Sequence, residues 1–245
     1  MPADTAAKPF RFKQFTIEQD RCAMKVGTDG VLLGAWADVA RAERILDVGT
    51  GTGVIAIQMA QRTDDGVQID AVEIDEDSYE QALENVDRCV WSERVSIHRG
   101  SIQDFAKRTR STTYDLIVCN PPFFSGGVLS DNHSRNVVRH TVKLPHGDLL
   151  MAVKKLLSRD GRFCVILPRM EGLRFREMSA QYGLHCTRIT EVRSRSEKPV
   201  ERLLLQFERT ERDEQRDQVV IQKSDVRNDW TDDYLALTGE FYLEG

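Results

Sequence analysis

Strand-like and helix-like segments alternate along most of this 245-residue chain, and this alternation constrains the fold more than any other feature of the sequence. Seven short apolar runs have the length and composition of buried strands: Arg44 to Gly49, Gln68 to Asp75, Val95 to Gly100, Tyr114 to Asn120, Arg162 to Pro168, His185 to Val192 and Arg202 to Glu208. Four segments between them carry apolar residues at helical spacing: Val54 to Arg62, Glu76 to Val90, Gly147 to Leu157 and Glu171 to Tyr182. This repeated order predicts an α/β fold with helices on both faces of a doubly wound, mostly parallel sheet.

The last two strand-like runs are joined differently from the others. A short polar loop that contains Pro199 links them and leaves no room for a helix. Such a connection favours an antiparallel hairpin, which we expect at one edge of the sheet. The sequence therefore predicts a Rossmann-like sheet of seven strands, and the chain length suits a single domain with one such sheet.

Composition excludes several classes of protein. Charged residues make up 30% of the chain, no apolar run approaches the roughly 18 residues of a membrane span, and residues 1–8 lack the apolar centre of a signal peptide. We therefore expect a cytoplasmic protein without a membrane segment. The five cysteines include no Cys-x-x-Cys pair, so we expect neither a metal site nor a disulfide.

The net charge of −5 argues against a generally basic nucleic-acid-binding protein. Basic residues nevertheless gather locally, at Arg135, Arg139, His140 and Lys143 and again between Arg188 and Arg202. Phosphate contacts are made by local clusters of this kind, so the acidic total leaves RNA binding open. A solvated loop surface is the alternative interpretation of these residues.

A glycine-rich turn follows the first apolar strand and indicates a class of ligand. The sequence Asp47-Val-Gly-Thr-Gly-Thr-Gly53 contains Gly49, Gly51 and Gly53, which allow the backbone to approach a ligand closely. The spacing differs from the Gly-x-Gly-x-x-Gly pattern that binds a dinucleotide. Asp47 would repel phosphate groups but suits the ammonium group of an amino-acid tail. Capping of the following helix is its alternative role.

Acidic residues also follow the next two strands. Glu73 ends the second strand, where a carboxylate can accept from both hydroxyls of a ribose, and Asp75 lies on the same strand face as its rival. A solvated strand end is the alternative for Glu73. Asp104 follows the third strand and can accept from an adenine amino group, or else cap a helix or turn. A ligand with an ammonium group, a ribose and an adenine but no phosphate is S-adenosylmethionine, which we predict as the methyl donor.

The cluster Asn120-Pro121-Pro122-Phe123 comes directly after the strand that ends at Cys119. Consecutive prolines remove two backbone donors and stiffen the chain, which leaves carbonyl oxygens beside an asparagine side chain and an aromatic ring. The Asn120 side-chain oxygen and the Pro121 carbonyl can each accept one hydrogen of an exocyclic amine, which redirects its delocalised lone pair. Phe123 can stack on a base. A Pro-Pro loop with a purely structural role is the alternative.

Together these motifs resemble the class I, Rossmann-like S-adenosylmethionine-dependent methyltransferases, and the Asn-Pro-Pro-Phe cluster resembles those that methylate planar exocyclic or amide nitrogens. Two flanking segments, Asp20 to Trp36 and Leu237 to Leu243, are similar to the bacterial tRNA1(Val) adenine-37 N6-methyltransferase family. The likeness extends from about Phe12 to Leu243. It implies methylation of the N6 amine of adenosine 37 in valine tRNA.

The resemblance also implies roles for residues outside the strand ends. Lys25, Thr28 and Asp29 lie in a turn and helix start that we expect to close over the donor, with Thr28 or Asp29 near its amino-acid tail. Capping is the alternative role for Thr28 and Asp29. Arg139 and His140 are expected to line the entrance for the RNA substrate, although the chemistry requires no general base because the methylated ammonium product is strongly acidic.

The resemblance covers the whole chain, so we expect a single methyltransferase domain. Residues 41–210 form the predicted Rossmann-like core. Residues 1–40 form an N-terminal extension on the donor and substrate side, and residues 211–245 form a C-terminal extension with a terminal helix. We expect the protein to act as a monomer.

Other acceptors share the same amine-binding motif. Related enzymes with Asn-Pro-Pro-aromatic motifs methylate adenine N6 or guanine N2 of ribosomal RNA, or the N5 amide of a protein glutamine, and the motif alone does not separate them. Glutamine methyltransferases usually carry a helical N-terminal domain, for which this chain has no room before Arg44. A third interpretation is a protein that binds the donor without catalysis, and the intact Asp47, Glu73 and Asn120 argue against it.

Overall fold

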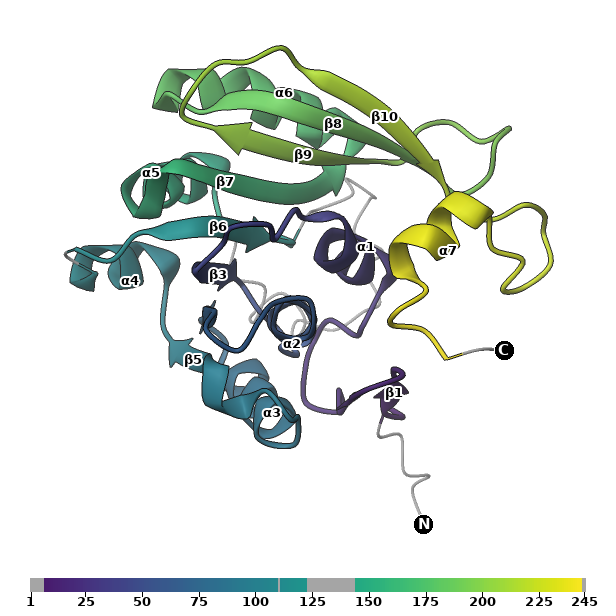
Figure 1. The fold of residues 1–245 in the computed structure, drawn as a ribbon, viewed down its shortest axis with the longest axis horizontal. Helices are drawn as coiled ribbons and strands as arrows, with labels where there is room; N and C mark the ends of the chain where they lie inside the picture. Colours follow the sequence, from purple (N-terminus) through teal and green to yellow (C-terminus); the bar gives the residue numbers. More distant parts are fainter. Residues whose placement is uncertain (1–6, 110, 123–143, 244–245) are drawn as a thin grey trace, which may run out of the picture.

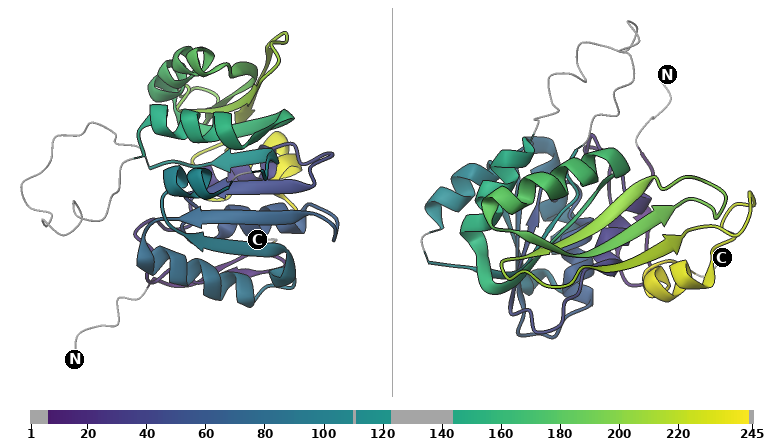
Figure 2. Two further views of the ribbon diagram at one scale, coloured as in Figure 1. Left: turned by 90° about the vertical axis from the view of Figure 1, so that its left-hand side faces the viewer. Right: turned by 90° about the horizontal axis from the view of Figure 1, so that it is seen from above.

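The computed structural model describes residues 7–109, 111–122 and 144–243, and its centre is one eight-stranded sheet (Figures 1 and 2). The order of strands across the sheet is β10-β8-β9-β7-β6-β3-β4-β5. The strand bounds are β3 (Arg44–Val48), β4 (Gln68–Glu73), β5 (Val95–Arg99), β6 (Tyr114–Cys119), β7 (Leu157–Pro168), β8 (His185–Arg193), β9 (Arg202–Glu208) and β10 (Gln215–Val220). Strand β9 runs antiparallel to β7 and β8, and the other neighbouring strands of this sheet are parallel.

This architecture confirms the predicted α/β fold with a mostly parallel sheet, with two differences. The sheet has eight strands rather than seven, because β10 adds to it. The antiparallel pair β8 and β9 was predicted at the edge, which is wrong, because β10 pairs in parallel with β8 and covers it. Strand β10 lacks the apolar pattern of the other strands. Its first four residues are exposed and only Val219 is buried, as suits an edge strand.

Helices cover both faces of the sheet. The described α-helices are α1 (Thr28–Trp36), α2 (Val54–Gln61), α3 (Glu76–Asp87), α4 (Ile102–Arg108), α5 (His146–Leu156), α6 (Arg169–Ser179) and α7 (Asp232–Thr238), and short 3₁₀ turns span Ser92–Arg94 and Ala180–Tyr182. Alternate strand residues point to opposite faces, so Ile45 packs in the core beneath α1 and α2 while Leu46 packs in the core beneath α4, α5 and α6. Burial on both faces explains why these strands read as continuous apolar runs. None of the described helices is long and apolar enough to cross a membrane.

The carboxyl ends of the parallel strands lie along one edge of the sheet. In the strand register, Val48 of β3 faces Val72 of β4 on one side and Cys119 of β6 on the other. The glycine turn after β3, Glu73 at the end of β4 and Asn120 after β6 are therefore neighbours. Ligands of open α/β sheets bind outside such strand ends, at the point where the strand order reverses.

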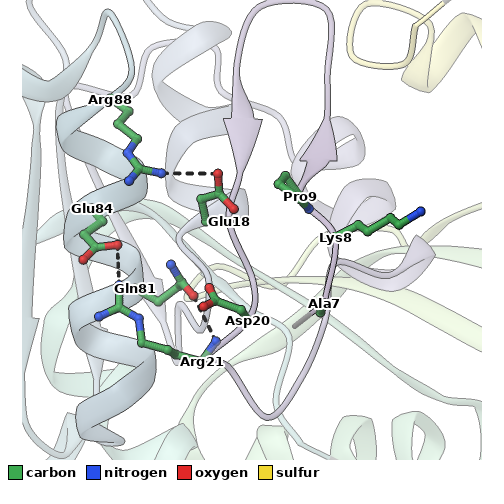
Figure 3. A pocket seen from close by; sticks show the side chains of 9 residues that line it. All are labelled: Ala7, Lys8, Pro9, Glu18, Asp20, Arg21, Gln81, Glu84 and Arg88. Carbon is green, nitrogen blue, oxygen red and sulfur yellow. Dashed lines mark hydrogen bonds and ion pairs between the residues drawn. The ribbon is translucent and has the colours of Figure 1, made fainter. Parts of the chain in front are cut away.

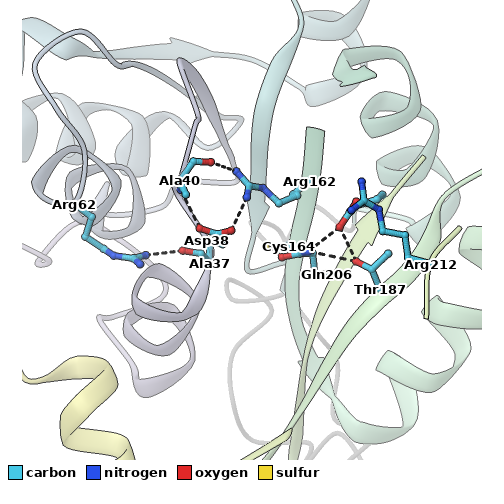
Figure 4. Close-up of polar contacts among 10 residues, drawn as sticks. Ala37, Asp38, Ala40, Arg62, Arg162, Cys164, Thr187, Gln206 and Arg212 are labelled. Carbon is cyan, nitrogen blue, oxygen red and sulfur yellow. Dashed lines mark hydrogen bonds and ion pairs between the residues drawn. The ribbon is translucent and has the colours of Figure 1, made fainter. Parts of the chain in front are cut away.

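Helix α1 is fixed at its carboxyl end, away from this edge. The Arg62 guanidinium donates to the carbonyl of Gly34 at 2.7 Å and to the carbonyl of Ala37 at 2.7 Å, and so satisfies carbonyls that the helix end leaves unpaired. Figure 4 shows the contact with Ala37. In the loop after the helix, Asp38 accepts a hydrogen bond of 2.5 Å from Arg162 of β7. These contacts fix the chain between α1 and β3, and with it the position of α1 over the sheet.

The two terminal segments pack against each other beside α1. A two-stranded sheet pairs β1 (Phe10–Arg11) with β2 (Thr16–Ile17), and Phe12 forms a β-bridge with Tyr242. The Tyr242 ring also stacks on Trp230 at a centroid distance of 6.2 Å. Helix α7 lies next to α1 in Figure 1, so the C-terminal segment supports the helix that begins at the functional edge.

Candidate active site

A cavity of about 620 Å³ opens at the carboxyl ends of β3, β4, β5 and β6. Its lining combines the glycine turn (Gly49 and Gly51), the end of β4 (Glu73 to Asp75), the start of α4 (Gly100 to Asp104), Asn120 with Pro122, and Ala23 with Met24 from the segment before α1. The structure thus brings together most of the acids, glycines and Asn-Pro residues that the sequence singled out. The cavity is large enough for a nucleoside-sized ligand.

The glycine turn takes a backbone course that side chains disfavour. Gly49, Gly51 and Gly53 have φ angles of 72°, 56° and 84°. The Gly49 N–H donates to the Val72 carbonyl of the next strand at 2.9 Å, which fixes the turn to β4. Gly49 and Gly51 border the cavity, whereas Gly53 caps α2 and packs against Ala82 of α3.

Asp47 lies fully buried at the end of β3, directly behind the residues that line the cavity. Its Oδ2 accepts a hydrogen bond of 2.6 Å from the Thr50 hydroxyl. Within the described part of the chain its Oδ1 has no hydrogen-bond partner. Burial raises the pKa of Asp47 to about 7 despite the Thr50 hydrogen bond, and the negative charge of Glu73 adds to the rise. A nearby cation would favour the ionised form.

Glu73 organises the turn as well as the cavity. Its Oε2 accepts from the Gly51 N–H at 2.9 Å, and its Oε1 accepts from the Ile74 and Asp75 N–H groups at 2.8 and 2.9 Å. Burial nevertheless outweighs these bonds and raises the pKa of Glu73. Asp75 borders the same cavity, but its Oδ1 caps α3 by accepting from the Ser78 N–H at 2.9 Å. Of the two carboxylates that are candidates to bind a ribose, Glu73 is more buried than Asp75.

Asp104 borders the cavity, but its carboxylate is already engaged in a helix cap. Ser101 caps α4 by accepting from the Asp104 N–H, and the Ser101 hydroxyl donates back to Asp104 Oδ2 at 2.8 Å. The Asp104 Oδ1 pairs with Lys107 at 3.2 Å. These two contacts hold the pKa of this exposed carboxyl below its ordinary value. The capping role is therefore present in the structure, and contact with an adenine stays a prediction.

Asn120 directly follows β6 and borders the same cavity. Its Oδ1 is buried and finds no hydrogen-bond partner among the described residues. The first turn of α1 is close, since a Cβ on Gly30 would lie 3.7 Å from Asn120 Nδ2. Pro121 is buried and Pro122 borders the cavity. Phe123, Arg139 and His140, predicted to contact the substrate, lie outside the described residues.

Lys25 and Thr28 do not border the cavity. The Lys25 Nζ donates to the carbonyls of Cys22, at 2.9 Å, and Gln19, and so braces the segment that carries Ala23 and Met24. Thr28 is the exposed first residue of α1, which has Gly27 as its N-cap and no side-chain cap. The capping alternative for Thr28 is thus not what the structure shows. Asp29 pairs with Arg202 of β9 at 2.9 Å.

The apolar residues that line the cavity were not predicted from the sequence. Met24 and Ile74 are large apolar residues with 50% and 43% of their surface exposed, and both border the cavity together with Ile102. An apolar surface beside two carboxylates suits a ligand that carries an aromatic ring. The sequence signal was an isoleucine between two acidic residues, Glu73 and Asp75, directly after the strand. In the described part of the chain no His, Cys, Asp and Glu side chains cluster as metal ligands would.

Comparison with known proteins agrees with this geometry. Residues 25–171 match the methyltransferase small domain family. A Trichodesmium erythraeum protein named tRNA1(Val) (adenine(37)-N6)-methyltransferase is 46% identical over 96% of this chain and 98% of its own length. A Cronobacter sakazakii protein of the same name is 42% identical over 96% of this chain and 94% of its own.

Solved structures show the same fold at low sequence identity. A predicted O-methyltransferase from Agrobacterium tumefaciens superposes with a TM-score of 0.67 at 15% identity, over 87% of this chain and 96% of its own. A methyltransferase from Pyrococcus furiosus gives a TM-score of 0.55 at 19% identity, over 80% of this chain and 90% of its own. The family match over residues 25–171 and the near full-length relatives show that the chain belongs to the methyltransferase small domain family and, within it, to the tRNA1(Val) (adenine(37)-N6)-methyltransferase family.

Proposed function

We propose that this protein uses S-adenosylmethionine to methylate the exocyclic N6 amine of an adenosine in tRNA, namely adenosine 37 of valine tRNA. The observation that carries the proposal is the buried Oδ1 of Asn120, which has no hydrogen-bond partner among the described residues and belongs to a residue that borders the cavity of the glycine turn and Glu73. The names of relatives that match over nearly their full length support the choice of acceptor.

The residues of the cavity fit S-adenosylmethionine. Asp47 offers a buried carboxylate directly before the glycine turn, and one of its oxygens has no hydrogen-bond partner in the described part of the chain, which suits the ammonium group of the donor. Glu73 or Asp75 would accept from the ribose hydroxyls, and Ile74 with Ile102 would cover the adenine ring. When bound, the donor supplies an electrophilic methyl group.

The end of β6 would hold the acceptor amine. The Asn120 Oδ1 accepts one amine hydrogen and the Pro121 carbonyl accepts the other, which draws the nitrogen away from planarity and frees its lone pair. Both acceptors are fixed before the substrate arrives, because β6 is a central strand and the two prolines stiffen the chain directly after it. Phe123 would stack on an adenine turned out of the anticodon loop. The methylated nitrogen then releases its proton to water without a dedicated base.

A pair of variants tests the division between donor site and amine site. We expect Asn120→Ala to retain donor binding in calorimetry and to lose methyl transfer to valine tRNA. Asp47→Ala should weaken donor binding first. Retained transfer by Asn120→Ala, measured by nucleoside mass spectrometry of the tRNA product, would contradict the role of Asn120.

The acceptor is tested in a strain that lacks this protein. We expect N6-methyladenosine to disappear from position 37 of valine tRNA and to return with a plasmid copy. Persistence of that nucleoside would exclude the proposed acceptor. Loss of a methyl group from ribosomal RNA or from a protein glutamine in the same strain would instead identify one of the other acceptors.

The proposal places the enzyme in the cytoplasm with its tRNA substrate and as a monomer. Light scattering of the purified protein, alone and with tRNA, measures the number of chains. A dimer that exchanges cavity residues between chains would contradict this part of the proposal.

A further inference from the structure

One face of α3 carries four polar residues that all contact the segment before α1. Gln81, Glu84, Asn85 and Arg88 are spaced three, four and seven residues along the helix and therefore share a face. Figure 3 shows Gln81, Glu84 and Arg88 along one side of the helix, opposite the segment that carries Glu18 and Arg21. This segment, residues 18–24, continues to Ala23 and Met24 in the lining of the cavity.

Asn85 differs from the other three residues on this face because its amide joins two parts of the chain, residues 18–24 and the glycine turn. It is almost fully buried, as is Gln81. Its Nδ2 donates to the Thr52 carbonyl at 2.8 Å and to the Glu18 carbonyl at 2.9 Å. Its Oδ1 accepts from the Glu18 N–H at 2.8 Å. Both amide hydrogens and the side-chain oxygen are thus in use. A carboxylate of the same shape lacks both donors, and an apolar side chain leaves three backbone groups without a partner.

Thr52 lies within the glycine turn, between Gly51 and Gly53. A single side chain therefore connects the glycine turn to residues 18–24, and both border the cavity. We infer that Asn85 is a positioning residue for the methyl donor: it fixes the distance between these two sides of the cavity. Because the cavity is the donor site only under the proposed function, this role rests on that proposal.

The buried Gln81 also contacts this segment, since its Oε1 accepts from the Arg21 N–H at 3.1 Å. The ion pairs between α3 and residues 18–24 are more exposed. Arg88 pairs with Glu18 at 3.4 Å, with side chains that are 58% and 32% exposed. Exposed ion pairs of this kind contribute little to a structure. Arg88→Ala is therefore a matched control, since it removes a contact from the same helix face to the same residue while leaving Asn85 in place.

The test compares Asn85→Leu, Asn85→Asp and Arg88→Ala in the full-length protein. Loss of a buried hydrogen-bonded group is expected to weaken S-adenosylmethionine binding about tenfold or more in both Asn85 variants, by calorimetry. The KM for the donor should rise by a similar factor, while kcat at saturating donor changes less than about threefold. Arg88→Ala should remain within about twofold of the native protein in both measurements.

A purely structural role for Asn85 predicts a different result. The melting temperature would fall, but the donor affinity of the folded fraction would match that of the native protein, and this outcome would overturn the inference. An equal loss of donor affinity in Arg88→Ala would also overturn it. Failure of the native protein to bind S-adenosylmethionine would refute the proposed function itself, and with it the role of Asn85.

A measurement on the native protein covers the case in which the Asn85 variants fail to fold. If Asn85 couples the two sides of the cavity, donor binding should slow amide hydrogen exchange in residues 18–24 and in the glycine turn together. Slower exchange in the turn alone, with residues 18–24 unchanged, would overturn the inference.

Discussion

Replacement of Asp47 by asparagine is expected to stabilise the fold near neutral pH while it removes donor binding. Asp47 is completely buried, and burial is the main reason that its pKa rises from 3.8 to about 7. Asparagine has almost the same shape, keeps an oxygen that can accept from the Thr50 hydroxyl and carries no charge. The variant therefore isolates the energetic effect of a buried carboxylate that the donor is expected to need.

The magnitude follows from the difference between the folded and unfolded states. Because the folded-state pKa is raised, Asp47 lowers the stability progressively between about pH 4 and pH 7, and the loss is complete above the folded-state pKa. A shift of about three pKa units corresponds to roughly 4 kcal/mol at 1.36 kcal/mol per unit. The asparagine variant has no such loss. An unpaired amide group in the buried site costs about 1–3 kcal/mol, but this cost does not depend on pH.

Urea denaturation of both proteins at several pH values between 4.5 and 8 measures this difference. The unfolding free energy of Asp47→Asn minus that of the native protein should increase by about 1.4 kcal/mol per pH unit up to about pH 7 and then level off. Asp65→Asn, at an exposed position, controls for the change in net charge. Parallel pH profiles for the native protein and Asp47→Asn would refute the reasoning, as would undiminished donor binding by the variant in calorimetry at pH 7.5.

Two other substitutions test interactions that stabilise the fold. Asp70 is the opposite case to Asp47: burial raises the pKa of Asp70, but hydrogen bonds from His98 and Tyr114 outweigh burial, and the pKa is lowered. Asp70→Asn should therefore reduce the free energy of unfolding near neutral pH. This difference from the native protein should shrink as the pH falls below 3.8, because Asp70 then becomes protonated in the native protein. Gly34→Ala would place a Cβ 2.1 Å from the Oε1 of the buried Gln58, and we expect a loss of about 1–3 kcal/mol in urea denaturation. Adding Gln58→Ala should recover most of that loss, and a purely additive double variant would contradict the steric explanation.

The sheet and the glycine turn were predictable because their signals are local. Strands β3, β4 and β6 are buried on both faces and therefore form apolar runs, and the three glycines of the turn adopt positive φ angles that other residues avoid. Asp47 and Glu73 could be located because each ends or nearly ends such a run. Strand β10 gave no signal, since an edge strand with one buried residue need not be apolar.

The N-terminal side of the cavity was harder to predict because it depends on contacts between distant residues. In the sequence, Asn85 looks like any other polar residue of an amphipathic helix. The fold shows that its amide joins Glu18 to Thr52. Asp104 was ambiguous for a related reason: the serine three residues before it provides a helix cap that competes for its carboxylate.

At the carboxyl ends of β3, β4 and β6, we expect residues that build the cavity and residues that serve a ligand to differ in the pairing of their polar atoms. Glu73 and Asn85 are buried, and their polar atoms are occupied by the backbone of the glycine turn and its neighbours. Asp47 and Asn120, at the ends of adjacent strands, each keep a buried oxygen without a partner in the described chain. Such an atom costs about 1–3 kcal/mol, and folding offers no compensation for it. A ligand that donates to these two oxygens would recover that energy on binding. Their substitution should therefore reduce binding or turnover without a matching loss of stability, whereas substitution of Glu73 or Asn85 should reduce both.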